Sequence, residues 1–473
     1  MGQIMTGSTL FDKLWDAHVV RALDETHDLI AIDRILLHER TGGIALKSLA
    51  EAGRAVRDPA RVFVTMDHVV DTLPGRNDET TLPTGKQFIV ETREAAKAAG
   101  VTLFDLPDPR QGIVHVISPE QAIVLPGLTL VCPDSHTCTQ GALGALAWGI
   151  GSSEAEHALA TNTLRVERPA NMRISIDGKL RDGVSAKDLA LHIVATLGSA
   201  GARGYMLEYA GEAVRDLDVE ARMTLCNMAT ELGAFSAIIA PDDKVFAYLQ
   251  DRPYAPTGAA WSAALSSWRT LSTDPDAAFK REFRFDAGEV APMVSWGTSP
   301  HQSVALGQEV REPCDEGDVR ARDYMGIGET RDVTGLPIDA AFIGSCTNSR
   351  LSDLRAVAAV LKGRRVAPGV RAICVPGSGA VKRAAEAEGI DRILIAAGFE
   401  WREPGCSMCF FAGGESFGQA ERVISSTNRN FENRQGPKTR THIAAPTTVA
   451  ASAVLGRIGW PSELTADAEE LAS

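Results

Sequence analysis

The chain has 473 residues, too many for one hydrophobic core, which predicts about two to four domains. Its net charge of −13 disfavours nucleic acid and anionic membranes as partners, and its apolar runs are too short to cross a bilayer. Eight cysteines without the spacing of a secreted disulfide framework, and no signal-peptide pattern, predict a cytoplasmic protein.

Helical and extended patterns alternate along most of the chain. In chain order we expect a helix at 86–99, strands at 101–106 and 127–132, a helix at 153–164, a strand at 171–176, a helix at 185–197 with Ser185 as N-cap, a helix at 219–232, strands at 235–239 and 339–343, a helix at 353–361, a strand at 372–375 and a helix at 380–388. Strands that alternate with helices predict an α/β fold with mostly parallel sheets.

Two stretches interrupt this alternation, 252–276 and 297–335, and the second is interpreted as a linker region before a last domain. A first boundary is expected near residue 170. The predicted domains are therefore 1–170, 171–294 and 295–473, the last of which carries the cysteines discussed next.

Three cysteines form a candidate metal site. Cys406 and Cys409 make a C-x-x-C, a spacing that redox, zinc and iron–sulfur sites share, and no second C-x-x-C completes a zinc site. Cys346 lies upstream, after an apolar strand and before a helix. Three thiolates can hold three irons of a [4Fe–4S] cluster and leave the fourth open, which suits a Lewis acid better than an electron carrier. The other cysteines are expected to be buried small hydrophobes, namely Cys132, Cys138, Cys226, Cys314 and Cys374.

Short motifs from end to end resemble the aconitase family, and within it the large subunits of isopropylmalate dehydratase. They read AIDR at 31–34, HE at 38–39, TMDH at 65–68, GIVH at 112–115, DSHT at 134–137, TLCNM at 224–228, GSCTNS at 344–349, PGCSMC at 404–409 and STNRNF at 426–431. The resemblance implies an α/β fold with three α/β/α-layered domains around a cluster site, without the family's swivel domain.

The resemblance also implies roles for individual residues. One [4Fe–4S] cluster per chain would be bound by Cys346, Cys406 and Cys409, with Asn227, Asn348 and Asn428 near it. Substrate would be bound by His38, Ser135, Arg429 and Arg434. Catalytic pairs would join Asp67 to His68, Asp134 to His115, and Glu231 to His136.

The implied reaction is a hydro-lyase isomerisation of 2-isopropylmalate and 3-isopropylmalate in leucine biosynthesis. An open iron takes up the charge of a departing hydroxyl, a histidine held by a carboxylate can protonate it, and arginines grip the carboxylates of the diacid. The family's carbon base lies in the swivel domain, and this sequence ends at Ser473, soon after Arg434. We therefore expect a separate small subunit as partner, in a heterodimer or higher heteromer.

Two alternatives remain open. A paralogue acting on citraconate, maleate or dimethylmaleate would share these residues, and the departures from typical members at Phe410 and Phe411 bear on that choice, although we expect those rings to pack in the core. A cluster-free RNA-binding protein is a different class, disfavoured by the charge of −13 and by the lack of a basic patch with interleaved aromatic residues.

Overall fold

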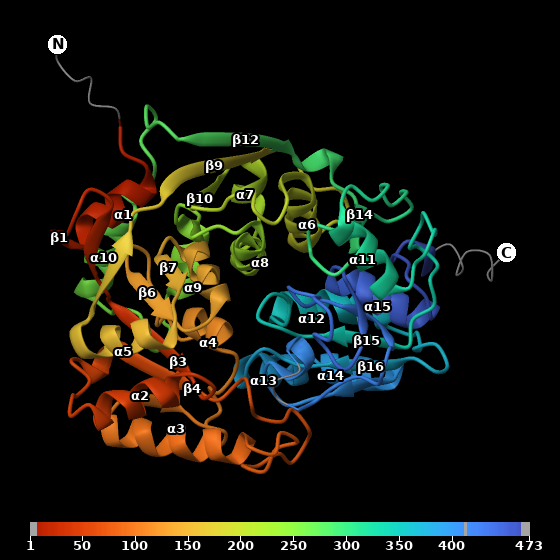
Figure 1. Cartoon of the computed structure of the whole chain (residues 1–473), viewed down its shortest axis with the longest axis horizontal. Helices are drawn as coiled ribbons and strands as arrows, with labels where there is room; N and C mark the ends of the chain where they lie inside the picture. Colours follow the sequence, from red (N-terminus) through yellow and green to blue (C-terminus); the bar gives the residue numbers. More distant parts are fainter. Residues whose placement is uncertain (1–6, 411–413, 465–473) are drawn as a thin grey trace.

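The computed structural model describes residues 7–410 and 414–464. Three parallel sheets dominate it, and two small antiparallel sheets accompany them within these residues. Figure 1 shows the first sheet on the left, the second sheet across the top and the third sheet on the right. This arrangement confirms the α/β class with parallel sheets that the sequence predicts.

The first sheet has the strand order β5-β4-β3-β6-β7, and all its neighbouring strands are parallel. Its strands are β3 (Arg34–His38), β4 (Val62–Thr65), β5 (Thr102–Phe104), β6 (Thr129–Cys132) and β7 (Leu146–Gly149). A small antiparallel sheet accompanies it, made of β1 (Val19–Ala22), β2 (His27–Ala31) and β8 (Thr163–Glu167).

The second and third sheets are also parallel throughout. The second, in the order β11-β10-β9-β12, comprises β9 (Ala170–Asp177), β10 (Tyr205–Ala210), β11 (Ser236–Ile238) and β12 (Arg281–Asp286). The third, in the order β17-β16-β15-β18-β19, comprises β15 (Ala340–Ile343), β16 (Arg371–Cys374), β17 (Phe399–Trp401), β18 (Arg422–Ser425) and β19 (Arg440–Ile443). Between them in sequence, β13 (Met293–Ser295) pairs antiparallel with β14 (Ser303–Ala305).

Helices cover the sheets. They are α1 (Leu10–His18), α2 (Gly42–Glu51), α3 (Gly85–Ala99), α4 (Val114–Glu120), α5 (Ser152–Thr161), α6 (Ala186–Leu197), α7 (Glu212–Asp216), α8 (Val219–Asn227), α9 (Asp243–Leu249), α10 (Ala259–Trp268), α11 (Glu316–Met325), α12 (Leu351–Leu361), α13 (Gly379–Ala387), α14 (Ile390–Ala397) and α15 (Pro446–Leu455). No helix among the described residues is long and apolar enough to span a membrane.

Capping explains where several helices begin. The side chain of Ser185 accepts the Asp188 backbone N–H and the Asp188 carboxylate accepts in return, which confirms Ser185 as the N-cap of α6. The apolar face of α6 then packs with α8 against the second sheet, where Ile193, Met223 and Leu207 are fully buried. Each such side chain contributes about 1.5–3 kcal/mol of transfer free energy.

The structure corrects three expectations. Asn162 adopts a left-handed conformation with φ 54°, so the helix predicted at 153–164 ends at Thr161 and the chain continues into β8. The stretch 252–276 contains the helix α10, because its alanines have a high helix propensity. The predicted linker at 297–335 contains β14 and the helix α11, which Asp315 caps at its N-terminus. Cys314 is exposed rather than buried. The domain boundaries near residues 170 and 295 stay predictions.

The carboxyl ends of the first and third sheets position the candidate site. Parallel α/β sheets place ligand-binding residues just beyond the carboxyl ends of their strands. Contacts join the two sheets at this edge: the Ile113 backbone N–H donates to the Gly377 carbonyl at 2.8 Å, and the Cys406 N–H donates to the Asp67 carbonyl at 2.8 Å. The helices α4 and α12 lie on the sides of the two halves that face each other (Figure 1).

Candidate active site

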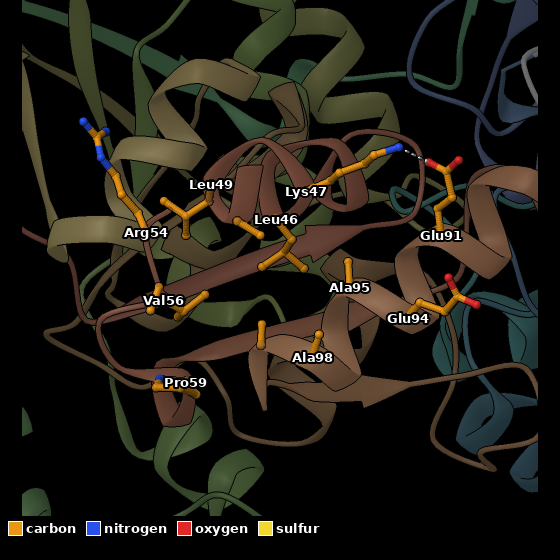
Figure 2. A pocket seen from close by; sticks show the side chains of 13 residues that line it. Leu46, Lys47, Leu49, Arg54, Val56, Pro59, Glu91, Glu94, Ala95 and Ala98 are labelled. Atoms are coloured by element: carbon orange, nitrogen blue, oxygen red, sulfur yellow. Dashed lines mark ion pairs between the residues drawn. The ribbon is translucent and has the colours of Figure 1, made fainter. Parts of the chain in front are cut away.

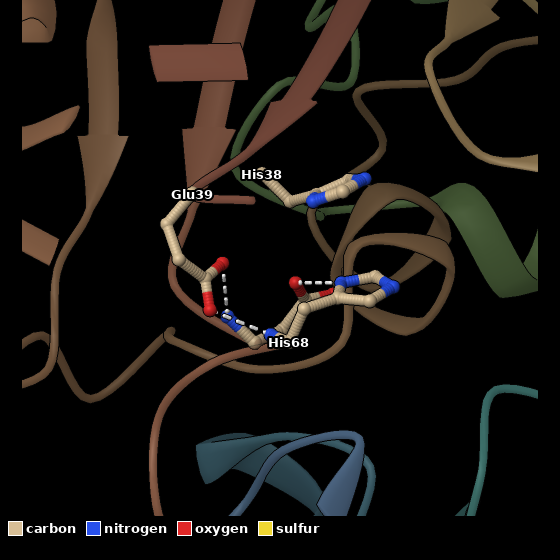
Figure 3. A group of neighbouring side chains, drawn as sticks. His38, Glu39 and His68 are labelled. Atoms are coloured by element: carbon tan, nitrogen blue, oxygen red, sulfur yellow. Dashed lines mark hydrogen bonds and ion pairs between the residues drawn. The ribbon is translucent and has the colours of Figure 1, made fainter. Parts of the chain in front are cut away.

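A buried carboxylate fixes the turn that follows β4. Glu39 accepts a hydrogen bond from the backbone N–H of His68 at 2.7 Å (Figure 3), and further ones from the backbone N–H groups of Asp67 at 2.9 Å and of Val69. Glu39 itself is fully buried directly after β3. The Glu39 carboxylate therefore fixes the backbone of the turn that carries Asp67 and His68.

Asp67 connects three segments of the chain. One carboxylate oxygen lies 2.6 Å from Nδ1 of His68, and the other accepts the backbone N–H of Val114 at 2.8 Å, at the start of α4. Its carbonyl accepts the N–H of Cys406. Burial alone would raise the pKa of Asp67, but the charge of His68 and its hydrogen bond hold that pKa below the ordinary value.

Asp134 contacts three histidines. Its carboxylate lies 2.9 Å from Nε2 of His115 and 3.3 Å from Nε2 of His68, and it accepts the backbone N–H of His136 at 2.7 Å. Burial would raise the pKa of Asp134, but the charge of His115 and hydrogen bonds from all three histidines keep it well below the ordinary range. One ionised carboxylate thus orients three imidazoles.

His68 holds a proton more tightly than an ordinary histidine. Burial alone would lower the pKa of His68, but the charge of Asp67, and hydrogen bonds to Asp134 and Asp67, raise it well above 6.5. Its side chain is 14% exposed, whereas that of His115 is 1% exposed. His68 therefore favours its protonated form more than an ordinary histidine does, and it retains a path to solvent.

His38 stacks on His68 with ring centroids 4.0 Å apart. Burial and the charge of His68 lower the pKa of His38 to about 4, so it is neutral, and its Nδ1 has no hydrogen-bond partner among the described residues. His38, Glu39, Asp67 and His68 have ligand-type atoms within 4.8 Å of one another (Figure 3). Because Glu39 is occupied by backbone donors and Asp67 by His68 and Val114, this group is a hydrogen-bonded network rather than a free set of metal ligands.

A second acid–histidine pair includes an arginine. Nε2 of His136 lies 3.2 Å from Glu231, which also accepts the Nε–H of Arg429 at 2.7 Å. Arg429 donates a further hydrogen bond to Oγ of Ser135 at 2.9 Å. Burial would raise the pKa of Glu231, but His136 and Arg429 lower it below the ordinary value, so the carboxylate is ionised.

The three cysteines of the candidate metal site are free thiols, each 7% exposed. Cys346 follows β15 through Gly344 and Ser345, and a Cβ at Gly344 would lie 2.6 Å from the Phe342 ring, so only glycine fits there. Ser345 has φ 82°, a left-handed conformation that turns the chain before Cys346. Cys406 directly precedes the 3₁₀ turn Ser407–Cys409, and Cys409 ends it. The local backbone thus places the three sulfurs at one edge of the third sheet.

Amide donors surround these sulfurs. Nδ2 of Asn227 lies 3.2 Å from Sγ of Cys346 and Nδ2 of Asn428 lies 3.4 Å from it, while Oγ of Ser345 lies 3.1 Å from Sγ of Cys409. Burial, and then the charge of Cys409, raise the pKa of Cys346 to about 12, so a bound cation would be needed to ionise it. Soft sulfur donors with N–H groups directed at them fit an iron–sulfur cluster.

Arg434 lies against two aromatic rings. Its guanidinium carbon is 4.5 Å from the centroid of Phe410 and 5.0 Å from that of Phe431, and its Nε has no hydrogen-bond partner among the described residues. Arg40 lies 4.7 Å from the Phe410 centroid. Phe410 is half-buried, so it contacts a candidate substrate-binding arginine rather than packing in the core, and Phe411 lies outside the described residues.

Asn348 is placed differently from the other two asparagines. Its amide donates to Thr224 at 3.3 Å and to Asp353 at 3.0 Å, and no hydrogen bond to a described cysteine is formed. Sequence reasoning missed Glu39 as an anchor, although a glutamate directly after a buried strand was a usable signal.

A hollow of about 730 Å³ lies between α2 and α3 (Figure 2). Leu46 and Ala95 contribute to its apolar wall, and Lys47 and Glu91 form an ion pair of 3.5 Å at its rim. None of the described residues that line it is a candidate catalytic residue or cysteine. The hollow is therefore separate from the site.

Three comparisons relate the chain to known proteins. Residues 12–456 match the family model described as "Aconitase family (aconitate hydratase)". The chain is 50% identical over 459 residues to the 3-isopropylmalate dehydratase large subunit 1 of Bradyrhizobium diazoefficiens, covering 96% of each chain. The holo-form crystal structure of aconitase X from Thermococcus kodakaraensis is 13% identical, with a TM-score of 0.47 over 88% of this chain and 87% of that one. This chain belongs to the aconitase family.

Proposed function

We propose that this chain is the large subunit of a [4Fe–4S] hydro-lyase that interconverts 2-isopropylmalate and 3-isopropylmalate in leucine biosynthesis. The observation that carries the proposal is the similarity of 50% identity over nearly the whole chain to a protein of that name. The acid–histidine network and the three thiols with amide donors are the chemistry that such a reaction requires.

The aconitase family implies an iron–sulfur cluster, and the donor set fits one. We assign Cys346, Cys406 and Cys409 as ligands of a single [4Fe–4S] cluster, supported by Asn227 and Asn428. When bound, the cluster supplies a Lewis-acidic iron that stabilises the charge of the departing hydroxyl.

The chain's own residues supply the proton transfer. The pKa of His68 is raised by Asp67 and Asp134, which favours the protonated imidazole, and Asp67 fixes its Nδ1. We assign its Nε2, which faces Asp134 at 3.3 Å, as the group that delivers a proton to the departing oxygen. His115, held by the same Asp134, keeps that carboxylate ionised and in position.

We assign the binding of the diacid to side chains that retain N–H donors without a partner among the described residues. Arg434 has a buried N–H without a partner, and Arg429, 28% exposed, keeps its guanidinium in place through Glu231 and Ser135. Both can grip a carboxylate of the substrate in a fork. His38 remains neutral beside His68 and is assigned to the substrate's polar groups.

The base that removes the carbon-bound proton is assigned to a separate small subunit carrying the swivel domain, which the words "large subunit" in the relative's name support. The test is anaerobic reconstitution of the chain with and without a candidate small subunit, followed by ultraviolet absorbance of the unsaturated acid. Turnover of isopropylmalate by the pair and none by the chain alone is the expected result. Full activity of the chain alone would refute the assignment of the base, and a preference for citraconate, maleate or dimethylmaleate would refute the substrate.

A further inference from the structure

Lys187 is a fully buried lysine in the first turn of α6. Its ammonium group donates to the carbonyls of Ser426 at 2.9 Å and Thr427 at 2.7 Å. Among the described residues, no carboxylate lies within ion-pair distance of it. A buried cation bound only to neutral carbonyls needs a compensating charge nearby, because the desolvation of an unpaired ammonium is costly.

The strand-end loop that Lys187 holds is the one that reaches the cysteines. Thr427 directly precedes Asn428, whose amide lies 3.4 Å from Sγ of Cys346. Burial lowers the pKa of Lys187 to about 7, and the opposing charges that act on it are those of Asp353, Cys346, Cys409 and Glu231. Glu231 is already engaged by the cationic Arg429 and by His136, whereas Asp353 accepts a hydrogen bond from the neutral amide of Asn348 and keeps its charge. Once Cys346 and Cys409 hold a cluster, their thiolates would add negative charge near Lys187.

We propose that Lys187 is the buried counter-cation of the iron–sulfur cluster, placed to compensate the negative charge of its thiolate ligands. This inference rests on the proposed function, since it requires that the three cysteines hold a cluster. Charge near an iron–sulfur cluster is one of the factors that set its reduction potential, and a cation stabilises the more reduced, more negative form. Lys187 therefore raises the potential of the cluster and strengthens its binding.

Two substitutions separate the charge from the hydrogen bonds. Lys187→Gln removes the charge and keeps an N–H donor, whereas Lys187→Met removes both and keeps the length. Lys244 offers a matched control, because its ammonium also donates to backbone carbonyls, those of Arg215, Asp216 and Leu217, but it is exposed. Lys244→Gln removes the same kind of contact at a remote place.

The experiment loads each full-length variant with iron and sulfide under anaerobic conditions and measures two quantities. One is the reduction potential of the cluster by mediated titration, and the other is the rise in melting temperature between the apo and loaded forms. We expect both Lys187 variants to shift the potential to more negative values and to shrink the rise in melting temperature. Lys244→Gln should leave both quantities at the wild-type values.

Two results would overturn the proposal. If Lys187 only holds the 426–427 loop, its variants would lower the melting temperature of the apo and loaded forms equally and leave the potential unchanged. A variant that folds, loads fully and keeps the wild-type potential would also refute it. Failure of the wild-type chain to take up iron and sulfide at all is a different outcome, which refutes the proposed function itself.

Discussion

Replacing Glu39 by alanine tests whether one carboxylate positions the proposed acid. In Glu39→Ala, the backbone N–H groups of Asp67, His68 and Val69 lose their acceptor. An orphaned buried donor costs about 1–3 kcal/mol, so the three together cost about 3–9 kcal/mol if none finds water. The lower figure corresponds to roughly a hundredfold increase in local opening.

The assay is hydrogen exchange at these three amides, together with turnover in the presence of the small subunit. Glu39→Gln should have an intermediate effect, because the amide oxygen can keep the two bonds made by one carboxylate oxygen and loses the third. Glu91→Ala is the matched control, since the ion pair of Glu91 with Lys47 is exposed and contributes less than about 1 kcal/mol. Wild-type exchange and turnover in Glu39→Ala would refute the reasoning.

Three further predictions concern other groups. Burial would lower the pKa of His18, but Asp33 at 2.9 Å raises it, while the pKa of Asp33 is depressed. The pair therefore stabilises the fold between about pH 4 and 6.5, and this contribution is lost as pH rises through the raised pKa of His18. His18→Gln should flatten the fall in melting temperature above about pH 6.5, and an unchanged slope would contradict this. Asp134→Asn should reduce kcat by at least about a hundredfold in steady-state assays, because the histidines lose their common carboxylate, and a near-normal kcat would exclude it from catalysis. Phe410→Leu should raise KM about 2- to 30-fold with a smaller change in kcat, since Arg434 loses a cation–π contact of about 0.5–2 kcal/mol; a pure kcat effect would argue against this positioning role.

Sequence patterns sufficed for the family and for the parallel α/β fold, because strands such as β15 are short apolar runs followed by a helix. The resemblance to the family also predicted the pairs of Asp67 with His68 and of Glu231 with His136, and both pairs are in contact. They did not reveal that Asp134 serves three histidines, since contacts between residues far apart in sequence depend on how the strand ends meet.

The sequence indicates that Lys187 is buried, but it does not indicate what Lys187 binds. Helical spacing places it on the same face of α6 as Leu191 and Val194, both buried, so a charged residue on an apolar face was visible in the sequence. Its partners were not visible, because they are backbone carbonyls at the end of β18, which any sequence could provide. Burial could thus be inferred from periodicity, but the acceptors required the fold.

Asp67 shows why loss of activity at this site has to be interpreted together with stability. Its side chain binds both His68 and the start of α4, and its carbonyl binds the Cys406 loop. Asp67→Asn therefore perturbs both catalysis and the packing of α4, and the resulting effects are not additive. Glu231→Gln is the cleaner substitution, because the side-chain contacts of Glu231 are with His136 and Arg429, both of which belong to the proposed chemistry. Comparing cluster content and turnover in the two variants would separate a positioning defect from a chemical one.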